Sequence, residues 1–169
     1  IKSEKKIDII VNNAGSIRTS IFQMTTSKVI REIFEVNFFS QSIFTQSLLK
    51  LMVKNNKGSI LFISSSSAID GNEGRSAYSS SKAAINTLAK VLSRELGKFN
   101  IRVNTIAPGL TDTDMMRKNT PDNVLNEVIS SISLKRVAKP EEIANVALLL
   151  SSDLMSYVTG QVIRVDGGM

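Results

Sequence analysis

The feature that most limits the fold of this chain is the alternation of short apolar, β-branched runs with longer stretches of helical spacing. Each run is four to six residues long and is flanked by turn-forming residues such as Asn, Gly, Ser or Pro, which is typical of buried strands. The runs are Ile7–Val11, Ser59–Ile63, Ile101–Ile106 and Val162–Val165.

Three stretches between these runs have the spacing of helices. Apolar residues recur every three or four positions from Lys28 to Lys54, and Ala77 to Gly97 predicts a long helix with Gly97 as its C-cap. Pro140, followed by two glutamates, is typical of a helix start. Strands that alternate with helices are joined by crossover connections, so we expect an α/β fold with a parallel sheet and helices on both faces. The polar stretch Thr111–Pro121 is predicted to be a mobile segment or lid.

Composition excludes several kinds of chemistry. The 169 residues contain no Cys and no His, so thiol nucleophiles, thiolate or histidine metal sites and Ser-His-Asp triads are excluded, and no metal is expected. The net charge of +6 comes from scattered basic residues, which favours a solvated surface over nucleic-acid binding. The first residues lack the apolar core of a signal peptide, and the longest apolar runs, such as Val146–Leu150, are too short to span a membrane. We therefore expect a cytoplasmic protein that binds neither membrane nor nucleic acid.

The pair Tyr78 and Lys82 stands near the start of the helix predicted from Ala77. Residues four apart share one helix face, so the phenol and the ammonium are expected side by side. A free tyrosine has a pKa of about 10, and an ammonium about 4 Å away supplies roughly 4 kcal/mol at an effective dielectric constant near 20. That energy corresponds to roughly three pKa units. We expect Lys82 to lower the pKa of Tyr78 and make it an acid–base catalyst, although most such pairs occur by chance on solvated helix faces.

Further polar residues follow the predicted strands. Ser65 ends the second run, thirteen residues before Tyr78, and Asn12 to Gly15 follow the first. Pro108 and Gly109 end the third run. Because open α/β sheets bind ligands at the carboxyl ends of their strands, these groups are predicted to share one pocket.

These motifs resemble the short-chain dehydrogenase/reductase family, and within it the 3-oxoacyl-[acyl-carrier-protein] reductases. The resemblance covers essentially the whole chain and implies a Rossmann-like doubly wound parallel sheet and an NAD(P)-dependent oxidoreductase. The matching segments are Asn12–Gly15, Val36–Phe38, Ile63–Ser65, Tyr78–Lys82, Ile101–Gly109, Thr113–Met115, Tyr157–Gln161 and Asp166–Gly168.

The resemblance also implies roles for individual residues. Tyr78 would be the general acid/base, and Ser65 would orient the substrate carbonyl. Lys82 would bind the nicotinamide ribose and lower the pKa of Tyr78, while Asn37 would fix a water that links Lys82 to solvent. Two alternatives stay open: the serines around Ser65 are also typical of a turn, and Asn37 is also typical of a helix break or cap. The implied cofactor-binding residues are Asn13, Ala14, Gly15, Tyr78, Lys82, Pro108, Gly109, Thr111 and Thr113.

The glycine-rich turn with which this family begins its cofactor site has no counterpart among the nine glycines of this chain. We therefore interpret residues 1–169 as the C-terminal catalytic portion of one Rossmann-fold domain, with its last four strands. Two βαβ units of about 30 or more residues each, roughly 70 residues, would precede Ile1 in a complete member. The 169-residue chain is expected to bind a dinucleotide weakly or not at all. The expected cofactor is NADP or NAD, with NADP favoured.

The predicted substrate is a carbonyl compound, with a 3-oxoacyl group on acyl carrier protein in first place. Lys54, Lys57 and Lys98 at helix ends are candidate contacts for that acidic carrier. Two alternatives remain: a dehydrogenase for a sugar, polyol or other small secondary alcohol, and a non-catalytic oligomerising fragment. By resemblance we also expect a homotetramer formed by the helix after Asn37, the Tyr78 helix and the C-terminal helix and strand.

Overall fold

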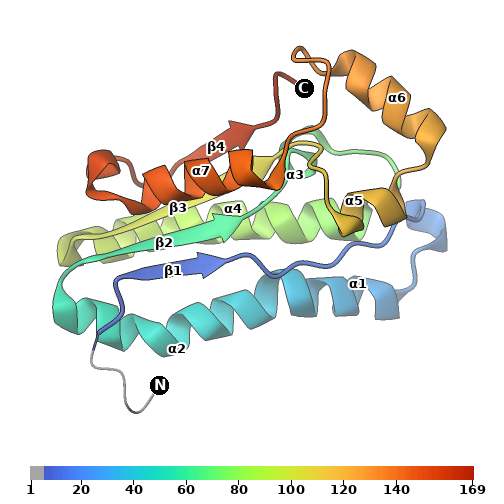
Figure 1. The fold of residues 1–169 in the computed structure, drawn as a ribbon. Helices are drawn as coiled ribbons and strands as arrows, with labels where there is room; N and C mark the ends of the chain where they lie inside the picture. The colour runs from blue at the N-terminus through green and yellow to red at the C-terminus, as the bar shows by residue number, and fades with distance from the viewer. Residues whose placement is uncertain (1–5) are drawn as a thin grey trace.

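The core of the protein is a four-stranded sheet, seen in a computed structural model that describes residues 6–169 (Figure 1). All neighbouring strands are parallel, and their order in the sheet is their order in the sequence. The predicted parallel sheet is therefore confirmed. The strands are β1 (Ile9–Asn12), β2 (Gly58–Ile63), β3 (Ile101–Pro108) and β4 (Val162–Val165).

The register brings the carboxyl ends of the strands to one edge of the sheet. Asn12 pairs with Phe62, Phe62 pairs with Thr105, and Thr105 pairs in turn with Val162. In Figure 1 this edge faces the side where α5 lies. Loops that leave the strands here can therefore contribute to one common site.

One face of the sheet is covered by α2 (Ser40–Asn55) and α4 (Ser76–Leu96). Alternate strand residues such as Ile60, Phe62 and Val103 point toward these helices and are fully buried. The stretch predicted as one helix from Lys28 to Lys54 divides into α1 (Ser27–Phe34), a π-helical turn η2 (Glu35–Phe39) and α2. The helix predicted from Ala77 is confirmed. Gly97 is its C-cap without a left-handed backbone, since its φ is −55°.

The opposite face is covered by α7 (Pro140–Ser151), as Pro140 and its two glutamates predict. Leu61 and Ile106 point to this side and pack with Leu150 in a second core. Ile9 and Val11 point the same way from β1, but α7 does not cover them, and they are 50% and 47% exposed. Helices therefore lie on both faces, and β1 carries apolar side chains that are open to solvent.

The segment predicted to be mobile or a lid, Thr111–Pro121, contains the helix α5 (Asp114–Asn119), and its mobility stays a prediction. The Thr113 hydroxyl caps its start by accepting from Met116 N at 3.2 Å. Within residues 6–169 no helix combines the length and the apolar character needed to cross a membrane. The remaining elements are η1 (Phe22–Met24), α3 (Ser67–Asp70), η3 (Gly97–Phe99), α6 (Asp122–Ser131) and η4 (Asp153–Met155).

Candidate active site

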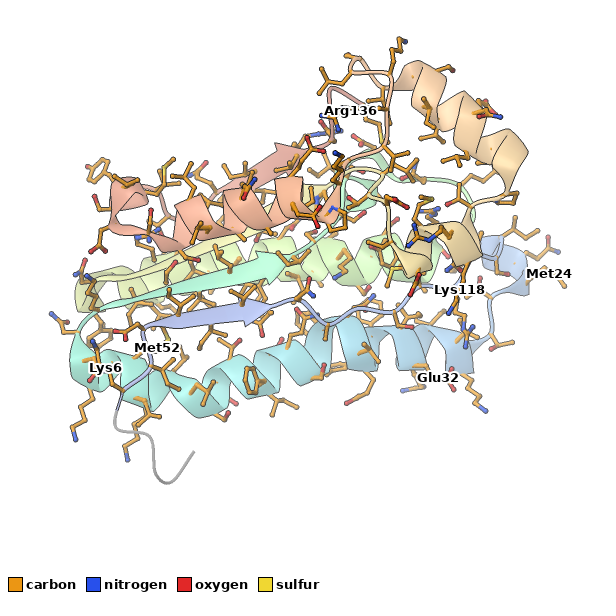
Figure 2. The ribbon with its side chains drawn as sticks, in the orientation of Figure 1. Lys6, Met24, Glu32, Met52, Lys118 and Arg136 are labelled. Atoms are coloured by element: carbon orange, nitrogen blue, oxygen red, sulfur yellow. The ribbon has the colours of Figure 1, made fainter. Side chains whose placement is uncertain are left out.

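A cavity of about 810 Å³ opens at the carboxyl edge of the sheet. Figure 2 places Lys118 of α5 at this end of the molecule and Lys6 and Met52 at the other end. Every catalytic or cofactor-binding residue expected from the sequence lines this cavity except Asn37. The predicted residues in its wall are Asn13, Ala14, Gly15, Ser65, Tyr78, Lys82, Pro108, Gly109, Thr111 and Thr113.

Tyr78 lies in the first turn of α4 and is almost completely buried. Burial raises the pKa of its phenol above the usual value of 10.0, because a phenolate is poorly solvated there. A hydrogen bond with Ser65 and the positive charge of Arg75 oppose this rise without cancelling it. The expected lowering of the Tyr78 pKa by Lys82 is therefore wrong for this structure: burial outweighs the charges, and the opposing charge is that of Arg75.

Lys82 follows one helical turn later and is 3% exposed. Its Nζ donates to the carbonyl oxygen of Ile63, the last residue of β2, at 2.6 Å. Burial lowers the pKa of Lys82 to about 8, because the ammonium has lost most of its water. Lys82 thus links α4 to the end of β2. With a pKa of about 8, it loses its proton more easily than an exposed lysine.

Ser65 differs from its serine neighbours in what its hydroxyl does. Its Oγ accepts from the backbone N of Ser67 at 3.2 Å, the first residue of α3, and it contacts the phenol of Tyr78. The Ser64 hydroxyl instead donates to the carbonyl of Lys82. The Ser66 hydroxyl points to the sulfur of Met169. Of these three side chains, Ser65 is the one that combines turn chemistry with a position beside Tyr78.

Asn37 lies outside the cavity wall and is fully buried at the centre of the π-helical turn. Its Oδ1 accepts from Ser16 N at 2.8 Å, and its Nδ2 donates to Ser16 O at 2.9 Å and to Ser81 Oγ at 3.0 Å. The amide therefore ties the loop after β1 to α4. Asn37 does lie where the regular α-helix is interrupted, as the alternative interpretation holds. It also cross-links η2, the loop after β1 and α4.

Lys82 and Asn37 approach the same gap beside Gly15. A Cβ atom built on Gly15 would lie 3.4 Å from Lys82 Nζ and 3.8 Å from Asn37 Oδ1. Any side chain at position 15 would therefore reduce the space between these two polar groups.

Three residues of the site were missed by sequence reasoning. Arg75 lines the cavity, and its place three residues before Tyr78 is a helical spacing that could have indicated it. Ser81 supports Asn37, and Gln41 donates to Ala14 O at 2.6 Å. These two act through tertiary contacts, which no local pattern in the sequence marks.

One part of the cavity wall carries positively charged side chains, and another part, from α5 and α7, is apolar. Among the residues whose side chains the structure describes, Arg75 and Lys82 are the charged ones that line the cavity, and no carboxylate does. Nor does that part of the chain contain a cluster of three or more side chains of the kind that hold metal ions. The far wall comes from α5 and α7, with Met115, Met116 and Ile143. The site is therefore suited to an electron-rich ligand with an apolar part.

Comparisons with known sequences agree on one family. A family model described as Enoyl-(Acyl carrier protein) reductase matches residues 1–169. A 3-oxoacyl-[acyl-carrier-protein] reductase of Chlamydia trachomatis is 44% identical over 163 residues, which are 96% of this chain and 65% of that protein. A 3alpha-hydroxysteroid dehydrogenase of Mediterraneibacter gnavus is 42% identical over 161 residues, or 95% of this chain and 64% of that protein. The chain thus spans slightly less than two thirds of the length of these curated relatives.

Solved structures show the same relationship. A structure described as a short chain dehydrogenase/reductase family protein superposes with a TM-score of 0.92 at 32% identity. The match covers 99% of this chain and 68% of that one. The order of strands and helices described above is therefore the order found in the corresponding part of that protein.

Proposed function

Because this chain belongs to the short-chain dehydrogenase/reductase family, we propose that it is the catalytic part of an NAD(P)-dependent reductase that acts on a 3-oxoacyl group carried by acyl carrier protein. The observation that carries the proposal is the meeting of Tyr78, Ser65 and Lys82 in one cavity at the carboxyl edge of the sheet. Relatives of this chain are named as reductases of that substrate at 38–44% identity.

Tyr78 is proposed as the general acid. Because burial raises the pKa of its phenol, the phenol keeps its proton at neutral pH, which is the form that a reduction requires. When bound, the nicotinamide supplies a hydride to the carbonyl carbon. The phenol proton then passes to the carbonyl oxygen, and the Ser65 hydroxyl orients that oxygen by a hydrogen bond.

Lys82 is proposed to bind the ribose of the cofactor. An ammonium has three donors, and the bond to Ile63 O uses one of them, which leaves two for ribose hydroxyls. Gly15 fits this role, because its missing side chain keeps the approach to Lys82 Nζ open. Asn13, Thr111 and Thr113 would line the rest of the cofactor, which we propose to be NADP or NAD.

Asn37 is proposed to hold a water that connects Lys82 to solvent. An amide oxygen has two lone pairs, and Ser16 N occupies one of those on Asn37 Oδ1. The second is available beside Gly15, where Lys82 Nζ also lies. A water bound there would connect Lys82 to solvent, from which Lys82 could regain a proton.

The apolar wall favours one alternative substrate over another. Met115, Met116 and Ile143 suit an acyl chain or a steroid, and relatives named as hydroxysteroid dehydrogenases match at 38–42% identity. The same wall offers few hydrogen-bond partners to a sugar or polyol, which makes those substrates the weaker alternative. A hydroxysteroid is therefore the second candidate.

The test is reduction of a 3-oxoacyl thioester by the complete gene product, assayed with NADPH and with NADH. We expect Tyr78→Phe to lower kcat by roughly 10²-fold or more, because the proton donor is lost. Tyr157→Phe is the matched control, since Tyr157 is fully exposed. Unchanged turnover in Tyr78→Phe would exclude the proposed acid. Absence of turnover with every carbonyl substrate would favour a non-catalytic, oligomerising protein.

A further inference from the structure

Arg164 of β4 contacts three residues, Asp70, Asp166 and Met169. Its two terminal nitrogens donate to the two carboxylate oxygens of Asp70 at 2.7 and 2.9 Å. Its Nε donates to Asp166 at 2.5 Å, and one terminal nitrogen also donates to the carbonyl of Met169 at 3.2 Å. Paired bonds of this kind fix direction as well as distance, because the guanidinium is planar.

Asp70 is the last residue of α3, a short helix that packs against α4 and is tied to β4 through Asp70. Four residues are too few for a helix to be stable by itself, so its position depends on tertiary contacts. Its one large apolar side chain, Ile69, is 48% exposed. The paired contact with Arg164 is a side-chain link between the end of α3 and β4.

The start of α3 controls the hydroxyl of Ser65. The backbone N of Ser67 donates to Ser65 Oγ, and Ser66 N donates to Pro108 O at 2.8 Å. Asp70 N in turn donates to Ser66 O at 3.0 Å. A shift of Asp70 is thus transmitted through one helical turn to the atoms that orient Ser65.

We propose that Arg164 is a positioning residue for the reaction: through its paired bonds to Asp70 it holds α3, and α3 sets the direction of the Ser65 hydroxyl. The inference rests on the proposed function for its catalytic consequence, because Ser65 is assigned there to the substrate carbonyl. The positioning itself is a property of the fold and can be measured without turnover.

The contact of Arg164 with Asp166 extends to the loop after β3. Asp166 also accepts from Gly168 N at 3.0 Å, and its backbone packs so closely on Gly109 that a Cβ there would lie 2.7 Å from Asp166 Cα. Gly109 lines the cavity. Arg164 therefore links the α3 side of the site to the loop after β3.

The test compares Arg164→Met with Arg136→Met. Arg136 is a matched control, since it makes an equally paired contact with Glu142, at 2.7 Å for both bonds, at a position outside the cavity wall. We expect Arg164→Met to lower kcat about tenfold with little change in KM, because a small displacement of a positioned group is costly in the transition state. Arg136→Met should leave both constants unchanged. Asp70→Asn should reproduce most of the loss in kcat.

A titration separates positioning from simple destabilisation. Within residues 1–169 the tyrosines are Tyr78 and Tyr157 and there is no tryptophan, so in the Tyr157→Phe variant of this 169-residue chain the ultraviolet signal of tyrosinate reports Tyr78 alone. Because the Ser65 hydrogen bond lowers the pKa of Tyr78, both Ser65→Ala and Arg164→Met should raise its midpoint. Circular dichroism over the same pH range tests whether each variant stays folded.

Two results would overturn the inference. One is a Tyr78 midpoint in Arg164→Met equal to that of the parent while Ser65→Ala raises it. The other is an equal loss of kcat in Arg136→Met. Failure of the proposed function gives a different pattern: no turnover in the parent, with the effect of Arg164→Met on the Tyr78 titration retained.

Discussion

At Lys82 burial opposes the charge of the ammonium. Its folded pKa of about 8 lies below the ordinary value of 10.5, so the unfolded chain binds more protons between these two values. The free energy of unfolding therefore rises as pH increases from about 8 to about 10.5, and below pH 8 the cost is fully present. A difference of this size corresponds to about 3 kcal/mol as an upper limit.

We predict that Lys82→Met stabilises the fold at pH 7 by up to about 3 kcal/mol, while turnover is lost. The gain should fade as pH rises toward 10.5, since Lys82 is then neutral in both states of the parent. Urea unfolding at several pH values measures it, with the exposed Lys90→Met on the same helix as control. A Lys82→Met variant less stable than the parent at pH 7 would contradict the prediction.

Arg75 offers a second prediction for a single residue. Its positive charge lowers the pKa of Tyr78, so Arg75→Gln should move the Tyr78 midpoint upward. The tyrosinate signal in the Tyr157→Phe background again gives the measurement. Arg94→Gln, an exposed position near the other end of α4, should leave the midpoint where it is. Equal shifts in the two variants would show that Arg75 acts only through net charge.

At the scale of elements, strands were easier to predict than their surroundings. The β-branched runs located all four strands, yet β3 continues through Pro108, because β4 pairs with its last four residues. The π-helical turn was not predicted, since its apolar spacing continues that of the flanking helices and only the tertiary bonds of Asn37 distinguish it. The direction of the Tyr78 pKa shift also depends on burial by segments distant in the sequence. The spacing of Tyr78 and Lys82 does not predict that burial.

The loop after β3 provides the prediction at this scale. In Gly109→Ala the new Cβ would lie 2.7 Å from Asp166 Cα, so a backbone segment must move, and we expect a loss of about 1–3 kcal/mol in the free energy of unfolding. Gly97→Ala is the matched control: its surroundings are open and its backbone is helical, so stability should stay the same or rise. Chemical denaturation measures both. An unchanged free energy of unfolding in Gly109→Ala would mean that the backbone at the end of β4 can shift at little cost.

At the scale of the whole molecule, a stripe of exposed apolar side chains runs along η2 and the start of α2. Val36, Phe39, Ile43 and Phe44 are 37–62% exposed, and their spacing places them on neighbouring faces of the helix. Exposed apolar surface of this kind is typical of contact sites between proteins. Self-association through this stripe therefore stays a prediction, with a homotetramer as the state expected from the family resemblance.

We predict that Ile43→Glu weakens self-association, because a charge would be buried in the contact. Light scattering over a range of concentrations should show a smaller mass for this variant than for the parent. Gln46→Glu introduces a similar charge at an exposed polar position of the same helix and should leave the mass unchanged. A monomeric parent would refute the homo-oligomer. An oligomer of unaltered mass in Ile43→Glu would show that the contact lies on another surface.

The order of the strands also bears on the synthesis of the protein. Among the four described strands, β2, β3 and β4 each pair with the strand before it in the sequence, so this part of the sheet can be assembled in the order in which the ribosome delivers it. Ser65, Tyr78 and Lys82 are all delivered before Arg164. A nascent chain that stops short of β4 would carry the reactive groups without the residue that aligns Ser65. Full catalytic competence would thus arrive only after β4 has been translated.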